Sequence, residues 1–211
     1  MLVMISHKHK YIYIHICKCA GSTISSTLPS HYSYKLKSKK HIPENERIYP
    51  ALSLINYHFT IHSIQNELNE DLFKEIFKFT FVRNPWSRIV SAYFFDKSHP
   101  NKRNPTFTSF SDYLKKIHQS TGLQSVHKLN CLDWISDKNG NVLVDYVGRF
   151  EHLQQDFDII CDKIGIPRQQ LPQKNKTKHK HYTEYYDDET REIVAEKYVK
   201  DIEYFGYKFG E

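Results

Sequence analysis

Two segments of this chain run from an apolar strand directly into a polar turn and then into the start of a helix. They are Tyr11-Ile-Tyr-Ile-His-Ile-Cys-Lys-Cys-Ala-Gly-Ser-Thr23 and Phe79-Thr-Phe-Val-Arg-Asn-Pro-Trp-Ser-Arg-Ile-Val-Ser-Ala-Tyr93. In an α/β sheet, ligands bind beyond the carboxyl ends of the strands. The segments therefore predict two anion sites at one edge of a sheet, and a ligand with two separate phosphate-like groups.

The rest of the chain alternates between strand and helix patterns, which predicts a mainly parallel α/β sheet. Apolar residues on both faces of 10–16 are typical of a central strand. Asn84 is expected to cap a helix that begins at Pro85. We expect the other strands at 76–82 and 142–150, and the other helices at 22–28, 60–72, 110–117, 153–164 and 187–202.

The composition limits the class of protein and of partner. A chain of 211 residues predicts a single domain over residues 1–211. The net charge of +6 indicates an anionic partner. The four cysteines lack zinc-ligand spacing, so we expect free thiols in a reducing compartment. With no signal peptide and no apolar run of membrane-spanning length, a complete chain is expected to be soluble and cytoplasmic.

The first predicted anion site follows the strand at 10–16. Gly21 allows the backbone to approach a ligand closely, Ser22 and Thr23 add hydroxyl donors, and Lys18 adds a full charge. No lysine directly precedes Ser22 or Thr23, so the segment is not a Walker A loop. The alternative interpretation is a tight turn with a solvated lysine.

The second predicted anion site follows the strand at 76–82. The guanidinium of Arg83 can bind a phosphate with two parallel hydrogen bonds, and Ser91 lies about two helical turns on. Arg88 precedes Ser91 by three residues, and for this side chain the favoured interpretation is a surface ion pair.

These residues resemble the PAPS-dependent sulfotransferases, in particular their carbohydrate-type group (family 2). The segment His15-Ile-Cys-Lys-Cys-Ala-Gly-Ser-Thr23 is similar to the loop that binds the 5′-phosphosulfate, although Cys17 and Cys19 replace the usual proline and threonine. The R-N-P-W-S-R-I-V-S-A-Y segment is similar to the 3′-phosphate motif. By this resemblance the donor-binding residues are Lys18, Ala20, Gly21, Ser22, Thr23, Arg83, Ser91 and, on a late loop, Asn175 and Lys176.

The resemblance implies a three-layer, P-loop-like fold with a central, mainly parallel sheet flanked by helices. It implies 3′-phosphoadenosine 5′-phosphosulfate (PAPS) as donor, without a metal, and sulfuryl transfer to a hydroxyl or amine of a saccharide or glycoconjugate. Lys18 is expected to stabilise charge on the leaving phosphate and the transferred group. His58 is the expected general base, by its place between the motifs, and His62 is the second candidate.

Three other interpretations stay open. A P-loop kinase or NTPase would need Mg²⁺ and a Walker lysine. A nucleic-acid-binding module would need stacking aromatics among clustered basic residues, and we expect no nucleic-acid partner. A degenerate relative would bind the donor without turnover. The acceptor, the choice between O- and N-sulfation and the oligomeric state are left open.

Overall fold

The computed structural model describes residues 3–6, 8–29, 60–68, 70–98, 107–119, 127–172 and 180–211. Its centre is a four-stranded sheet with the strand order β1-β2-β3-β4. The strands are β1 (Val3–Ser6), β2 (Tyr11–Ile14), β3 (Phe77–Val82) and β4 (Tyr146–Arg149). β2, β3 and β4 are parallel, and β1 pairs antiparallel with β2. β1 was not expected from the sequence.

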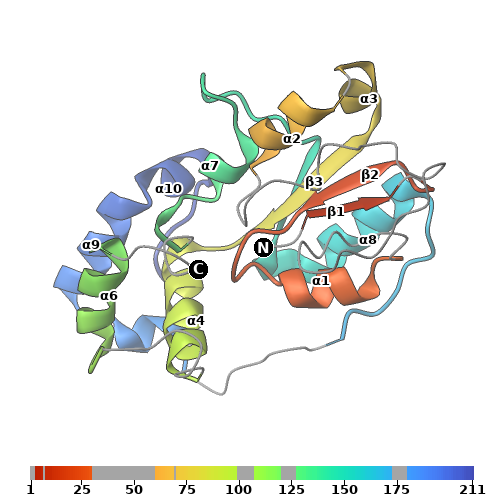
Figure 1. Ribbon diagram of the computed structural model, residues 1–211. Helices are drawn as coiled ribbons and strands as arrows, with labels where there is room; N and C mark the ends of the chain where they lie inside the picture. Colours follow the sequence, from red (N-terminus) through yellow and green to blue (C-terminus); the bar gives the residue numbers. More distant parts are fainter. Residues whose placement is uncertain are drawn as a thin grey trace.

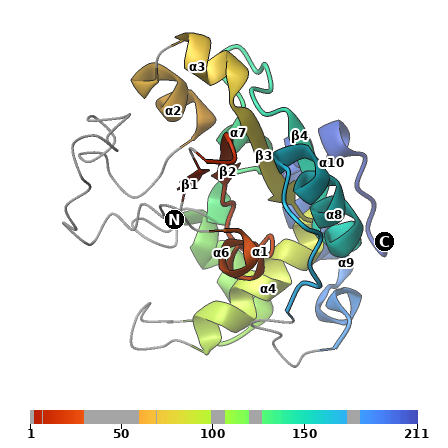
Figure 2. The same ribbon diagram turned by 90° about the vertical axis from the view of Figure 1, so that its right-hand side faces the viewer.

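Helices cover both faces of this sheet. In Figure 1, α1 and α8 lie on one side of the strands and α2 on the other, with α3 next to the start of β3. These helices are α1 (Gly21–Thr27), α2 (Ile61–Glu67), α3 (Glu70–Glu75) and α8 (Leu153–Ile164). The view after a quarter turn shows the same separation of α1 from α2 (Figure 2). The expected α/β class, with a central and mainly parallel sheet flanked by helices, is confirmed.

A second group of helices lies beyond the carboxyl end of β3 (Figure 1). It consists of α4 (Pro85–Lys97), α6 (Phe110–Gln119), α7 (Leu132–Ile135), α9 (Asp188–Lys197) and α10 (Val199–Phe205), with the 3₁₀ turn η5 (Tyr182–Tyr185) against α4. The other 3₁₀ turn, η4 (Phe150–His152), directly precedes α8. Aromatic rings fill the interior of the helical group: Tyr93 contacts Phe110 and Tyr113 at centroid distances of 5.5 and 5.4 Å. Among the described residues, no helix is long and apolar enough to cross a membrane.

Three predicted elements have different bounds. The helix expected at 60–72 is two helices, α2 and α3, and α3 begins with Glu70 and Asp71, whose charges favour a helix N-terminus. The helix expected at 187–202 is also divided, because the backbone leaves helical geometry at Tyr198. The strand expected at 142–150 is reduced to β4, and Val142 only forms an isolated bridge with Ser136.

Two helix boundaries follow from local chemistry as expected. The Asn84 side chain accepts hydrogen bonds from the backbone amides of Trp86 and Ser87, and Pro85 occupies the first helical position of α4. Gly165 ends α8 in the left-handed conformation, with φ of 68°. Both boundaries depend only on residues that are close in sequence, so they can be predicted without knowledge of the fold.

A buried carboxylate joins α4, α7 and α10. Asp201 on α10 is fully buried and accepts hydrogen bonds from the backbone amides of Cys131, at 2.7 Å, and Leu132, at 2.9 Å. Arg88 on α4 donates to the Sγ of Cys131 and to the carbonyl of Leu129. The two bonds to Asp201 satisfy amides at the start of α7, whose N-cap residue Cys131 makes no side-chain cap.

The interpretation of Arg88 as a surface ion pair is therefore wrong. Its side chain is 2% exposed and lies 5.0 Å from the centre of the Tyr198 ring. The four cysteines are free, as expected, and Cys19, Cys131 and Cys161 are buried.

Replacing the buried carboxylate should cost much of the stability of this region. We expect Asp201→Ala to lower the free energy of unfolding by about 3–5 kcal/mol, because it leaves two amides and the Arg88 charge without this partner. The measurement is urea denaturation followed by circular dichroism. Asp188→Ala, which removes an exposed carboxylate paired with Arg191, is the control and should cost less than about 1 kcal/mol. A loss below about 1 kcal/mol for Asp201→Ala would contradict this account.

Candidate functional site

The turn between β2 and α1 carries unusual backbone geometry. Lys18 and Ala20 both have left-handed conformations, with φ of 68° and 62°. For a residue with a Cβ, this region costs about 1–2 kcal/mol. Strain of this kind is concentrated at binding sites, where the surrounding structure holds it in place. Ala20 is the residue before α1 and supplies no side-chain cap, so the first turn of α1 can serve an outside ligand.

Gly21 is required here because His15 lies against it. A Cβ on Gly21 would lie 1.8 Å from Nε2 of His15, far inside van der Waals contact. The ring of His15 also stacks on Tyr13, with centroids 6.0 Å apart. The His15 Nδ1 and the Tyr13 hydroxyl are enclosed, with no hydrogen-bond partner among the described residues. The glycine therefore permits close approach between the end of β2 and the start of α1.

His15 is a neutral side chain in this setting. Burial lowers its pKa to about 4, and the charge of Lys18 acts in the same direction. At pH 7 the imidazole therefore packs without charge and does not compete with Lys18 for an anion.

Arg83 connects the two segments that the sequence singled out. Its NH1 donates to the carbonyl oxygen of Lys18 at 3.3 Å. Its Nε and NH2 both donate to the hydroxyl of Ser87, at 3.0 and 2.8 Å. The guanidinium lies 3.9 Å from the centre of the Phe150 ring, in the first turn after β4. Each of these hydrogen-bond acceptors is neutral, and burial lowers the pKa of Arg83 although the Glu151 carboxylate acts in the opposite direction. The guanidinium is thus restricted in position without a charged hydrogen-bond partner.

One row of α4 faces the turn at 17–20. Ser87, Ser91 and Phe95 are four residues apart and so share one face of the helix. Ser87 accepts from Arg83 at one end of this row. At the other end, Nζ of Lys18 lies 4.1 Å from the centre of the Phe95 ring. Ser91, which is half-buried, lies between these two contacts.

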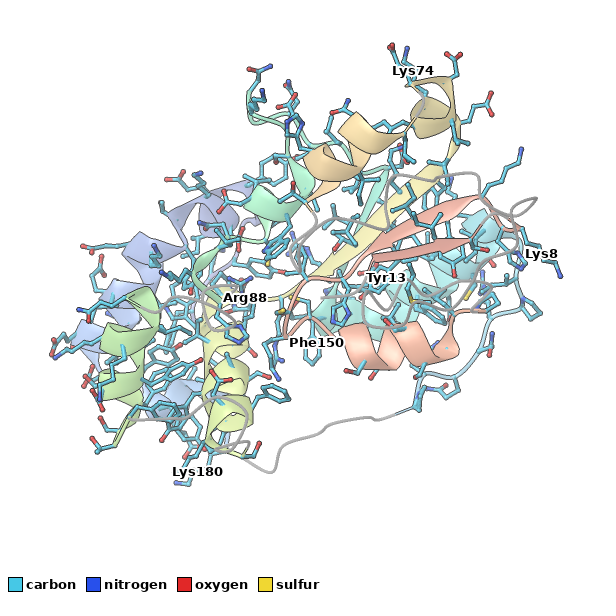
Figure 3. All side chains as sticks on the ribbon, viewed as in Figure 1. Lys8, Tyr13, Lys74, Arg88, Phe150 and Lys180 are labelled. Carbon is cyan, nitrogen blue, oxygen red and sulfur yellow. The ribbon has the colours of Figure 1, made fainter. Side chains whose placement is uncertain are left out.

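Sequence reasoning missed Ser87, Phe95 and Phe150. The spacing of four residues from Arg83 to Ser87 and from Ser91 to Phe95 was a readable signal for the first two. Phe150 had no such signal, because β4 reaches Arg83 only through the sheet. Figure 3 shows Phe150 where the strands meet the helical group, with Arg88 also labelled in that region.

The predicted residues divide into three sets. The fold brings Lys18, Ala20 and Gly21 next to Arg83 through its hydrogen bond to the Lys18 carbonyl. Ser22 is exposed at the start of α1, whereas Thr23 is 6% exposed. The third set, His58, Asn175 and Lys176, lies outside the described residues.

His62 is placed by other contacts. It is half-buried on α2, which packs against α7. Its charge makes a small contribution to the lowered pKa of Asp137, which is caused first by the hydrogen bond from the Asn141 side chain. His62 therefore lies near the start of the 137–141 turn. In the part of the chain that the structure describes, no group of three or more His, Cys, Asp or Glu residues is arranged to hold a metal ion.

Comparison with known proteins agrees with these motifs. A sequence model described as the sulfotransferase family matches residues 2–208. The chain belongs to the sulfotransferase family. The resemblance read from the two motifs is thereby confirmed, and family membership supports sulfuryl transfer as the class of reaction.

Individual relatives match parts of the chain. Carbohydrate sulfotransferase 9 of Homo sapiens is 27% identical over 155 residues, which are 59% of this chain and 32% of that protein. An uncharacterised protein of Archaeoglobus fulgidus is 30% identical over 106 residues, 50% of this chain and 82% of its own. The solved sulfotransferase from Alicyclobacillus acidocaldarius matches with a TM-score of 0.41 and 16% identity, over 70% of this chain and 59% of its own.

Because His15 lies against Gly21, we expect the effect of a Gly21→Ala substitution on stability to depend on whether His15 is present. Gly21→Ala should destabilise the protein by about 1–3 kcal/mol, because the new methyl group overlaps the imidazole. In a His15→Ala background the same substitution should be neutral or slightly stabilising, since alanine favours a helix more than glycine does. Thermal or urea unfolding of the four proteins completes the cycle. Equal losses in the two backgrounds would show that His15 is not what excludes a side chain at position 21.

Proposed function

We propose that this chain is a PAPS-dependent sulfotransferase, which moves a sulfuryl group from PAPS to a hydroxyl or amine of a saccharide or glycoconjugate. The observation that carries the proposal is the hydrogen bond from Arg83 to the Lys18 carbonyl, because it joins the two predicted anion sites into one. A nucleotide with phosphate groups at its 3′ and 5′ positions has the two separate anions that such a site requires.

Each end of the donor has its own set of residues. In this proposal Lys18, Ala20, Gly21, Ser22 and Thr23 hold the 5′-phosphosulfate, with backbone amides, hydroxyls and one ammonium. At the other end, Arg83 and Ser91 hold the 3′-phosphate, and Asn175 and Lys176 close over it. The support comes from the left-handed turn and its Gly21 contact for the first set, and from the restrained guanidinium for the second.

The residues of the chain act mainly by position and charge. PAPS supplies the sulfuryl group, and the reaction resembles phosphoryl transfer, in which in-line placement and charge stabilisation supply most of the rate enhancement. Lys18 places a positive charge where negative charge develops on the leaving side. We propose no metal, because the ammonium of Lys18 and the guanidinium of Arg83 already provide two fixed cations.

Transfer to a hydroxyl also requires a base to accept the proton. We propose His58, which precedes α2 by three residues, since a neutral imidazole can accept a proton near physiological pH. His62, on α2, is the second candidate.

The acceptor class rests on similarity and charge. The human relative is named as a carbohydrate sulfotransferase, and the net charge of +6 suits an acceptor that already carries negative charge. One family model matches residues 2–208, which supports the proposal that residues 1–211 form one domain.

Donor recognition is tested by calorimetry with 3′-phosphoadenosine 5′-phosphate (PAP), the desulfated product. We expect the wild type to bind PAP more tightly than AMP, ATP or GTP, and Arg83→Ala to weaken PAP binding about 10- to 100-fold, the range for lost charge-assisted hydrogen bonds. Arg168→Ala removes an exposed arginine that pairs with Asp162, and should bind PAP as the wild type does. Preference for ATP or GTP with Mg²⁺, or no nucleotide binding, would overturn the proposal.

The base is tested by separating turnover from binding. His58→Ala should lower kcat by about 10²–10⁴-fold, the usual contribution of a general base, while PAP binding is unchanged. His62→Ala should keep most of the activity. In the wild type the rate should fall at acidic pH, because a protonated imidazole accepts no proton. Strong residual activity in His58→Ala, with a large loss in His62→Ala, would transfer the role to His62.

A further inference from the structure

Lys18 is held at its backbone by a residue just before α4 and at its ammonium by a residue on α4. Its carbonyl oxygen accepts a hydrogen bond from Arg83, two residues before the helix. Its ammonium lies over the ring of Phe95, near the far end of the same helix, at 4.1 Å from the centroid. The lysine therefore extends along the row of α4 that also carries Ser87 and Ser91.

We propose that Phe95 is a positioning residue for Lys18: its ring holds the ammonium over the donor site, so that the charge is in place when the donor binds. This inference rests on the proposed function, because it assigns Phe95 a role in donor binding. It adds a residue that lies outside both phosphate motifs.

The physical need for such a residue follows from the nature of lysine. Its four-carbon chain carries about 2 kcal/mol of rotamer entropy, and its ammonium is a strongly hydrated point charge without the fixed fork of arginine. A hydrogen bond can hold the backbone of Lys18, but it does not orient Nζ. The face of an aromatic ring attracts a cation without neutralising it, unlike a carboxylate. The ring of Phe95 therefore restricts the ammonium without neutralising it.

The adjacent ring provides a matched comparison. Phe94 points elsewhere, because its ring contacts Tyr93 at 5.0 Å and Tyr185 at 5.1 Å, within the aromatic interior of the helical group. Phe94→Leu and Phe95→Leu remove the same ring from neighbouring positions of one helix, and only Phe95→Leu removes the ring over Nζ. Phe95→Tyr keeps the ring.

The contact itself is tested by NMR without any ligand. Lysines are reductively methylated with ¹³C-formaldehyde, which keeps their charge, and the signal of Lys18 is identified by its absence in Lys18→Arg. An ammonium over a ring face is shifted upfield, so we expect a displaced Lys18 signal in the wild type, Phe95→Tyr and Phe94→Leu. In Phe95→Leu the signal should return to the position of solvated lysines. An undisplaced signal in the wild type would overturn the inference, whatever the protein binds.

The role is tested by PAP titration of the same four proteins. Because an exposed cation–π contact contributes the equivalent of two- to fivefold in an equilibrium constant, we expect Phe95→Leu to weaken PAP binding about two- to fivefold. Phe95→Tyr and Phe94→Leu should bind PAP as the wild type does, and the displaced Lys18 signal should persist in the PAP complex.

The outcomes separate this inference from the proposal on which it rests. If the wild type does not bind PAP, the proposed function fails and the role of Phe95 fails with it. If the wild type binds PAP and Phe95→Leu binds it equally well, only the role of Phe95 is overturned. Tighter binding by Phe95→Leu would also overturn it, because the ring would then compete with the donor for Lys18.

Discussion

The rotation of α4 about its own axis determines what the site contains. Arg88 is buried on this helix and is fixed by the carbonyl of Leu129 and the thiol of Cys131, next to the Asp201 carboxylate. Ile89 and Val90 are buried as well, so the helix cannot turn without exposing them. The row that begins at Ser87 is therefore kept toward the strand ends. The contacts of Arg88 thus determine which side chains of α4 lie toward the strand ends.

Arg83 and Arg88 are five residues apart, and their different surroundings give their charges different roles. Arg88 lies near a buried carboxylate, and its charge is used within the protein to join three helices. Arg83 is nearly as buried, at 9% exposed, but its hydrogen bonds go to a hydroxyl and a carbonyl. These partners carry no charge, and the nearby Glu151 carboxylate does not offset the effect of burial, which lowers the pKa of Arg83. Burial of a charged group is costly, so the arrangement favours the binding of an anion.

Local signals in the sequence predicted those parts of the fold that depend on neighbouring residues. The strand-to-helix turn at Gly21, the cap at Asn84 and the end of α8 at Gly165 belong to this class. The pattern could not show that Arg88 is buried, because its partners lie more than forty residues away along the chain. The break at Tyr198, where φ is −111°, also had no local signal; the hydroxyl of this buried residue donates to the distant carbonyl of His127. Periodicity alone continued the helix through it.

The α4 row also sets a length. Eight residues separate Ser87 from Phe95, which corresponds to about 12 Å along a helix. The buried face of α4 fixes the helix, so the length of this row does not change. Under the proposed function, the row therefore fixes the separation between Arg83 and the ammonium of Lys18. A nucleotide with anionic groups on opposite sides of its sugar can reach toward both ends. The phosphates of a linear polyphosphate lie next to one another, so they reach only one of the two ends. The site would then discriminate among nucleotides by the separation of their charges rather than by their number.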